Sequence, residues 1–320
     1  MRHKLIPLTC VAVAGLVAIG GCSSAHRSAA PSTGTSARLS PPPIPASPSP
    51  PAADGTGVHL PLDAYVVESA QDTQALKRAN QILVQRCMAT RGFTYTITPS
   101  TPDSAGGVQS RDEPYGITDP AAAQRLGYSR SGGNYASRGV SSDIPELGQL
   151  LADHGTAWVV ALFGAVPPAT PGPNQPQGCV NAGPANLYDT AYGSLNRSIV
   201  GELADQANQH TQADSRVLKV EQAWSACMSA RGFSYANPML AASKQWPRPP
   251  ASEEIATAVA DVACKQQTNL PGIWLAVESG YQQQLVEQNA TALNEFRTAH
   301  QRLVQMAQQG VASAAASPNG

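Results

Sequence analysis

The six cysteines are the residues of this sequence whose type and spacing most clearly indicate a chemical role. Cys87 and Cys227 each open a nine-residue stretch of the form Cys-Met-x-x-Arg-Gly-Phe-x-Tyr, so one motif occurs twice. Cysteines form disulfides in an oxidising compartment, whereas zinc needs closely spaced ligands such as Cys-x-x-Cys, which the sequence lacks. The cysteines therefore predict disulfides and no metal site.

Candidates for acid–base catalysis are few. The sequence contains no His-Glu-x-x-His, no Gly-x-Ser-x-Gly and no phosphate-binding glycine loop. His210 and Asp214 stand four residues apart and could share one helix face as half of a metal or acid–base site, although surface polar residues often have this spacing. A catalytic pair assembled from Asp189, Glu202 or His210 is the alternative that the sequence leaves open. No cofactor is predicted.

The tryptophans and the paired acids favour structural roles. The adjacent acids Glu253 and Glu254 would point apart on a helix, so solvated charge or helix capping explains them better than catalysis. Four tryptophans lie in apolar surroundings, which favours core positions over a carbohydrate-binding platform: Trp158, Trp224, Trp246 and Trp274.

Helices must position these side chains. Gly92 and Gly232 stand where a helix ends in the left-handed conformation, and an arginine before each glycine opposes the helix dipole. Each motif is therefore predicted to be a helix end, a glycine stop and an extended exit used for packing; the alternative is that the two copies form a paired ligand site. Apolar residues before each motif recur at helical intervals and place each cysteine on the buried face: Leu76, Ala79 and Leu83, then Val217, Val220 and Trp224.

Helix dominates the rest of the chain, and no alternating strand pattern extends over a useful length. Residues 97–142 are rich in Ser, Gly, Pro and Asp, and a loop of this length is our favoured partner-contacting region. The predicted fold class is mainly α, a helical domain with long irregular loops. Its helices are expected at about 70–91, 145–162, 181–210, 214–231, 252–265 and 271–309.

The N-terminus has the features of an export signal. A basic start precedes an apolar run at residues 5–20 that is too short to span a membrane. Ile19-Gly20-Gly21-Cys22 resembles the lipobox of bacterial lipoproteins, in which the cysteine receives diacylglycerol and becomes the first residue after cleavage. The resemblance implies that residues 1–21 are a signal peptide. It also implies that a lipid on Cys22 anchors the protein at the extracytoplasmic face of the cell membrane.

A tether and a helical domain are expected after the signal. Residues 22–57 are rich in Pro and Ser with little to bury, which predicts a disordered tether. Residues 58–310 form the predicted helical domain, in two related halves at about 58–180 and 181–310, followed by a disordered tail at 311–320. Removing the signal lowers the 21 basic side chains to 19 against 22 acidic ones, so nucleic acid is not an expected partner.

The four cysteines of the domain allow three disulfide connectivities. If each motif cysteine closes its own half, the bonds are Cys87–Cys179 and Cys227–Cys264. A Cys87–Cys227 bond would instead mean that the two motif copies clasp each other. The repeat favours the first arrangement, in which each half carries one disulfide.

Several short pieces accompany the two motif copies: Leu60-Pro61-Leu62-Asp63-Ala64-Tyr65, Pro114-Tyr115-Gly116, Gly127-Tyr128 and the stretch from Ala258 to Lys265. In these pieces the chain resembles the uncharacterised secreted lipoproteins of actinobacteria. The resemblance implies an envelope location and supports pairing within the halves, and it implies no activity. We therefore expect a membrane-anchored lipoprotein that binds an envelope protein or a wall component, with an envelope hydrolase as the alternative.

Overall fold

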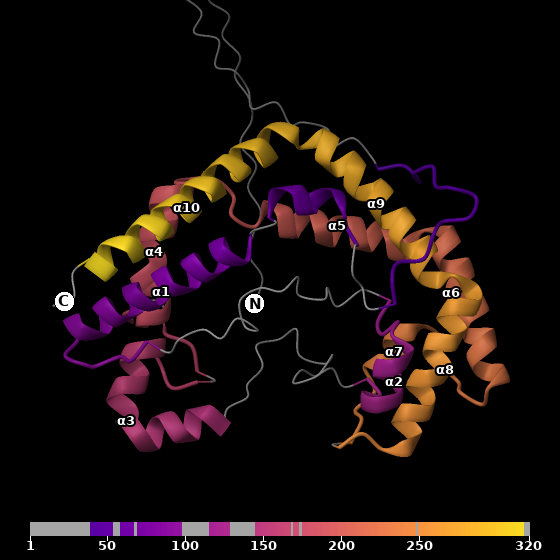
Figure 1. The fold of residues 1–320 in the computed structure, drawn as a ribbon, viewed down its shortest axis with the longest axis horizontal. Coiled ribbons are helices and arrows are strands. Elements are labelled where there is room, and N and C mark those ends of the chain that lie inside the picture. The colour runs from indigo at the N-terminus through magenta and orange to yellow at the C-terminus, as the bar shows by residue number, and fades with distance from the viewer. Residues whose placement is uncertain are drawn as a thin grey trace, which may run out of the picture. The chain divides into compact units, whose positions relative to one another are not determined.

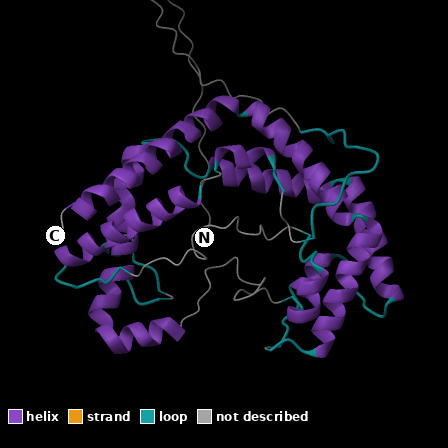
Figure 2. Ribbon diagram, in the orientation of Figure 1, coloured by secondary structure: helices purple, strands orange, loops and turns teal. Residues whose placement is uncertain are grey.

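The structure is a computed structural model, and its described residues are mainly helical without any strand (Figure 2). The predicted fold class is confirmed. The described residues are 39–53, 58–66, 69–97, 115–128, 145–167, 169–172, 175–247 and 249–316. The elements, labelled in Figure 1, are η1 (Pro61–Tyr65), α1 (Ala70–Thr90), α2 (Pro120–Leu126), α3 (Pro145–Phe163), α4 (Cys179–Tyr192), α5 (Ile199–Ala213), α6 (Ser215–Ala230), α7 (Pro238–Ala242), α8 (Ser252–Thr268), α9 (Leu270–Gln288) and α10 (Ala290–Ala316).

Two helices that the sequence predicts as continuous are each divided. The expected helix at 181–210 is α4 and α5, because Gly193 adopts a φ of 58° and ends α4. The expected helix at 271–309 is α9 and α10, which meet at Asn289, whose side-chain amide donates to the Leu285 carbonyl at 2.8 Å. Both breaks occur at residue types that commonly end helices.

The end of the chain also differs from the prediction. α10 continues to Ala316, so the tail predicted to start at residue 311 is helical for six further residues. The stretch from Val311 to Ala316 is mostly alanine, which favours helix, and Val311 packs against the main core. Helix α3 matches its expected position but is kinked at Gly155, where φ is 79°.

Part of the predicted loop at 97–142 is ordered against α8. Its residues 115–128, which we call the docked segment, contain α2, whose start is capped by Asp119. Tyr115 and Tyr128 are both 1% exposed, so they are core residues and do not offer a partner-contacting surface. The loop prediction is wrong for this segment because its two tyrosines bury enough apolar surface to fix it on α8. Apart from residue 97, the remainder of that loop lies outside the described residues.

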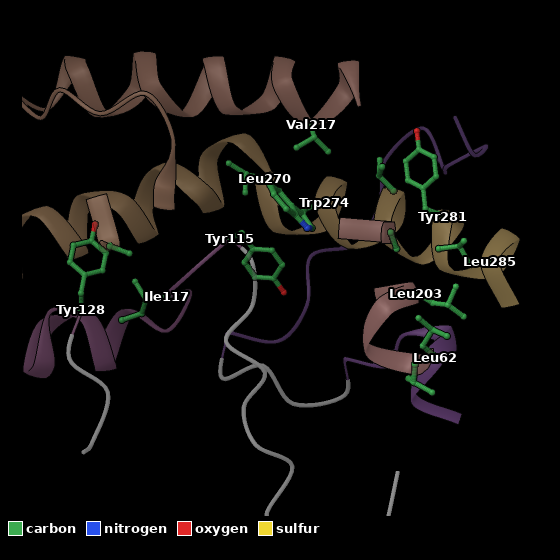
Figure 3. Close-up of a cluster of buried hydrophobic side chains, with 14 of the residues drawn as sticks. Leu62, Tyr115, Ile117, Tyr128, Leu203, Val217, Leu270, Trp274, Tyr281 and Leu285 are labelled. Carbon is green, nitrogen blue, oxygen red and sulfur yellow. The ribbon is translucent and has the colours of Figure 1, made fainter. Parts of the chain in front are cut away.

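One main hydrophobic core joins the two halves of the sequence. Helix α1 packs on α4 and α10, and α2 packs on α8. Figure 3 shows Leu62 of η1, Tyr115 of the docked segment and Trp274 of α9 within this core. A smaller hydrophobic cluster lies between α3, the end of α1 and the start of α4. The predicted core positions of all four tryptophans are confirmed: Trp158, Trp224, Trp246 and Trp274.

Each motif copy forms the same helix end. In the first copy the Phe93 N–H bonds to the Met88 carbonyl and the Gly92 N–H to the Ala89 carbonyl, both at 3.0 Å, with φ of 79° at Gly92. This pair of bonds is the Schellman arrangement that a left-handed glycine allows. The second copy repeats it with Phe233 to Met228, Gly232 to Ser229 and φ of 88° at Gly232.

The exits after the glycines are also held alike. The Gln85 amide donates to the Tyr95 carbonyl at 2.9 Å, and the Ser225 hydroxyl donates to the Tyr235 carbonyl at 2.6 Å. Gln85 and Ser225 occupy the same position relative to their motif cysteines. The repeat is therefore preserved in local structure even though the two halves share one core.

The prediction of a disordered tether is wrong for residues 39–53. Figure 1 shows this segment, in dark violet, alongside α9 and α6. Leu39, Pro42 and Pro48 are buried. We call residues 39–48 the strap. Proline fixes φ, so a proline-rich chain has less conformational entropy to lose on binding, and a few contacts suffice to hold it.

Candidate functional site

Both disulfides form within the halves, so the favoured pairing is confirmed. Cys87 of α1 is bonded to Cys179 at the start of α4, and Cys227 of α6 is bonded to Cys264 of α8. Each motif cysteine ties its own helix to a later one, and neither bond links the two copies. Cys22, the predicted lipidation site, lies outside the described residues.

The two motif arginines have different partners. Arg91 donates from Nη1 to the Ala161 carbonyl at 2.9 Å and from Nη2 to the Gln177 carbonyl at 2.7 Å. Arg231 Nη1 lies 3.0 Å from Cys264 Sγ, beside the second disulfide. Arg91 therefore holds the end of α1 to α3 and to the chain just before α4, and Arg231 packs beside the disulfide that joins α6 to α8. These contacts fit the packing interpretation of the repeat better than a paired ligand site.

The catalytic candidates each have a separate partner. Asp189 pairs with Arg197, and Glu202 accepts a hydrogen bond from Asn196 Nδ2 at 2.8 Å. His210 lies two helical turns beyond Glu202 on α5, about 12 Å along the helix axis. The structure therefore does not bring Glu202 and His210 together as an acid–base pair, and it pairs Asp189 with an arginine.

The spacing of His210 and Asp214 does not give a shared helix face, because α5 ends at Ala213 and Asp214 caps the start of α6. The Asp214 carboxylate accepts hydrogen bonds from Arg216 Nη2 at 2.6 Å and from Tyr281 Oη at 3.1 Å. The bond from Arg216 holds the pKa of Asp214 below its usual value, against the opposing effect of burial. The His210 ring instead packs against Tyr281, with ring centroids 5.3 Å apart.

A buried polar cluster fastens the docked segment to α8. The fully buried Asp261 carboxylate accepts hydrogen bonds from Lys265 Nζ at 2.8 Å, Trp224 Nε1 at 2.9 Å and Tyr128 Oη at 3.2 Å. Lys265, also buried, donates a further bond to the Ile117 carbonyl at 2.9 Å. Glu254, predicted to be solvated or capping, is likewise buried and accepts from the Tyr128 N–H at 3.0 Å. These contacts join the docked segment, which belongs to the first half of the sequence, to α8 in the second half.

Burial shapes the electrostatics of this cluster. It raises the pKa of the Asp261 carboxyl and lowers the pKa of the Lys265 ammonium, because both charged forms lose hydration, while their mutual attraction opposes both shifts. Burial also raises the pKa of Tyr128, which keeps its hydroxyl protonated and donating. Because the Trp224 N–H and the lysine ammonium can only donate, the geometry matches an ionised Asp261. Asp261 and Lys265 are at most 1% exposed, so the cluster is closed to solvent and serves to hold the docked segment on α8.

The strap is held to α9, α6 and the α8–α9 junction through its backbone. The Ser40 N–H donates to Gln284 Oε1 at 3.1 Å, and the Ser40 carbonyl accepts from Gln284 Nε2 at 2.8 Å. The Pro42 carbonyl accepts from Arg216 Nη1 at 2.6 Å. The Pro48 carbonyl accepts from the side-chain amide of the junction residue Asn269 at 2.7 Å. Both ends of the stretch between the two prolines are thereby fixed.

An open pocket lies beneath that stretch, and we call it the strap pocket. Its volume is about 680 Å³, within the range of ordinary ligand sites. A second pocket between α1, α4 and α10 is smaller, at about 170 Å³. The sequence did not predict the strap pocket, and the prolines between Leu39 and Pro48 are the feature that could have pointed to it. The residues that line it are Pro43, Ile44, Pro45, Ala46, Pro48, Arg216, Lys219, Val220, Ala223 and Ile273.

Within the described ranges, no group of three or more His, Cys, Asp or Glu side chains is placed to hold a metal ion. None of the helices in that part of the chain is both long and apolar enough to cross a membrane. Comparison with known proteins gives no match, either to a family model, to a curated protein or to a solved structure.

Proposed function

We propose that this chain is a lipid-anchored lipoprotein of the bacterial cell envelope that acts as a binding module, with the strap pocket as its binding site. The anchor is assigned to Cys22 from the lipobox resemblance, and it places the protein on the extracytoplasmic face of the membrane. The partner is an envelope protein or a wall component. The resemblance to secreted actinobacterial lipoproteins supports the same location.

The observation that carries the binding proposal is the lining of the strap pocket. Ile44, Val220 and Ile273 supply apolar surface, and Lys219 supplies a cation. Arg216 also lines the pocket, but its guanidinium is paired with Asp214. Among the described residues that line it there is no carboxylate and no imidazole, so these residues offer no pair to share a proton transfer. Apolar surface with a few convergent polar groups is typical of ligand sites.

Site-specific photo-crosslinking in intact cells tests this function. A benzophenone amino acid placed at Ala223, an exposed residue lining the strap pocket, is expected to give adducts of discrete mass. The matched control is Gln222, which is exposed on the same helix, points about 100° away and does not line the pocket. Equal crosslinking at the two positions, or none at Ala223, would refute binding at this site.

A further inference from the structure

The first part of the strap presents two anchors to the helices. In an extended chain with three residues per turn, as in polyproline II, Leu39 and Pro42 fall on one side. Both are buried, whereas Ser40, Pro41 and Pro43 are exposed. The strap then bends at residues 46 and 47, before the buried Pro48. Leu39 and Pro42 therefore have the spacing of neighbouring anchors in a polyproline ligand.

The helices bind the strap mainly through its backbone N–H and carbonyl groups, which any extended chain possesses. Gln284 pairs with both the N–H and the carbonyl of Ser40, and Arg216 takes the carbonyl of Pro42. Gly280 makes room for the same proline, because a Cβ at Gly280 would stand 2.4 Å from Pro42 Cβ. A backbone clamp beside a proline-sized recess suits an extended peptide with an apolar residue three positions before a proline.

We infer that this surface of α9 and α6, which we call the strap groove, binds a proline-rich extended segment of another envelope protein, and that the strap is its competing internal ligand. The inference rests on the proposed binding function and names the class of partner. The partner would lie along α6 and α9 in place of the strap, so it contacts the helical side of the strap pocket and replaces the side that the strap supplies. A ligand tethered in the same chain acts at a high effective concentration, so the strap lowers the apparent affinity for an outside peptide. Displacing the strap would expose the groove.

A labelled peptide of residues 37–50 is the probe for this exchange. In the full-length chain, the strap variant Leu39→Asp/Pro42→Asp removes both anchors that precede the strap pocket and leaves α9 unchanged. Fluorescence anisotropy is expected to show that this variant binds the peptide about tenfold or more tightly than the unchanged protein does. A control peptide with the same two substitutions is expected to bind neither protein.

Two groove variants, each made in the strap variant, test whether the peptide uses the site that the strap vacates. Gly280→Val fills the recess for the proline and is expected to abolish binding. Gln284→Ala removes only the backbone clamp from a half-exposed side chain and is expected to weaken binding at least several-fold. Circular dichroism checks that each variant is folded. If Gly280→Val does not fold, the Gln284→Ala result alone tests whether the peptide uses the strap groove.

Several results would overturn the inference. These are absence of peptide binding to the strap variant, equal binding of the control peptide, and unchanged binding by the folded Gln284→Ala variant. Concentration-dependent dimers of the unchanged protein that the strap variant fails to form would show that the occupant is a second copy, which also contradicts it. Crosslinking at Ala223 would still occur if the pocket bound a different ligand, so failure of this inference is distinguishable from failure of the proposed function.

Discussion

Asp214 joins three parts of the molecule through one carboxylate. It caps α6, accepts a hydrogen bond from Tyr281 of α9 and orients Arg216, whose remaining Nη1 holds the Pro42 carbonyl of the strap. The side chain of Asp214 is 1% exposed, so these bonds are shielded from bulk water. One of the bonds that hold the strap therefore comes from an arginine oriented by Asp214, a residue that the sequence alone suggests as an acid–base candidate.

The variant Asp214→Asn is expected to show, as a function of pH, how much the charge of Asp214 stabilises the fold. Arg216 holds the pKa of Asp214 below its usual value, so the folded protein binds fewer protons here than the unfolded chain. The stabilisation is fully present above about pH 5 and is lost as the pH falls through the unfolded-state pKa to the folded-state pKa. Asparagine keeps the helix cap, so the loss at pH 7 should be about 1–2 kcal/mol, from the charged hydrogen bonds alone.

Urea denaturation at pH 7 and at pH 2.5 measures the effect, with the difference between the two proteins expected to shrink at the lower pH. Asp189→Asn is the matched control, because Asp189 forms an ion pair in which both side chains are largely exposed. It should change stability by less than about 0.5 kcal/mol at either pH. An equal loss for Asp214→Asn at both pH values would contradict this account.

The burial of the Asp261–Lys265 pair could not be predicted from the sequence. Asp261 interrupts an apolar run from Ala258 to Cys264, and Lys265 follows that run directly. Two opposite charges four residues apart usually lie on a solvated helix face. The burial of this pair depends on Trp224 and on Tyr128, which lies 133 residues away in the chain. A helix pattern shows that the pair shares a face, but not that a distant segment covers it.

At the scale of elements, the parts that are local in sequence are predicted best. The helix ends at Gly92 and Gly232 follow from bonds between residues at most five apart, so the motif alone predicts their geometry. The strap is different, since the residue that clamps Ser40 is 244 positions away, and a proline-rich stretch with few apolar residues is typical of a tether. Its buried anchors are visible in sequence only as a three-residue spacing.

The second disulfide lends itself to a direct test, because its loop is short and its helices belong to the main core. The double change Cys227→Ser/Cys264→Ser is expected to lower the free energy of unfolding by about 2–5 kcal/mol and to leave the other bond formed. Denaturation of the variant with peptide mapping under non-reducing conditions measures both effects. A single Cys227→Ser change should be worse in practice, because it frees Cys264 for intermolecular bonds.

The first disulfide is the matched comparison. Its sequence separation is 92 residues against 37 for the second. Loop-closure entropy alone therefore predicts that losing the Cys87–Cys179 bond costs about 0.8 kcal/mol more. A Cys87–Cys227 peptide in the map of the wild-type protein would overturn both the pairing and the interpretation of the repeat.

At the scale of the whole molecule, the strap shortens the connection between the proposed anchor and the folded unit. That unit begins at Leu39, where the sequence had suggested residue 58. The chain between Cys22 and Leu39 can extend at most about 60 Å, roughly half the reach of a free chain to residue 58. Thr118 donates to the Ala53 carbonyl at 2.8 Å, so the residues just after the strap are also attached, here to the docked segment. Release of the strap would thus change the reach of the protein together with access to the groove.

The proposed anchor is tested by Cys22→Ala. This change is expected to abolish labelling with a fatty-acid analogue and to release the protein into the medium or leave it as unprocessed precursor, because Cys22 is the proposed acylation site. The stability of the helical domain should be unchanged, since the folded unit begins 17 residues later. Cys10→Ala is the control and should still be labelled, because Pro7, Leu8 and Thr9 before it do not resemble a lipobox. A Cys22→Ala protein that still matures and takes up the fatty acid would end the lipoprotein assignment, while peptide binding to the strap groove would remain open to measurement on its own.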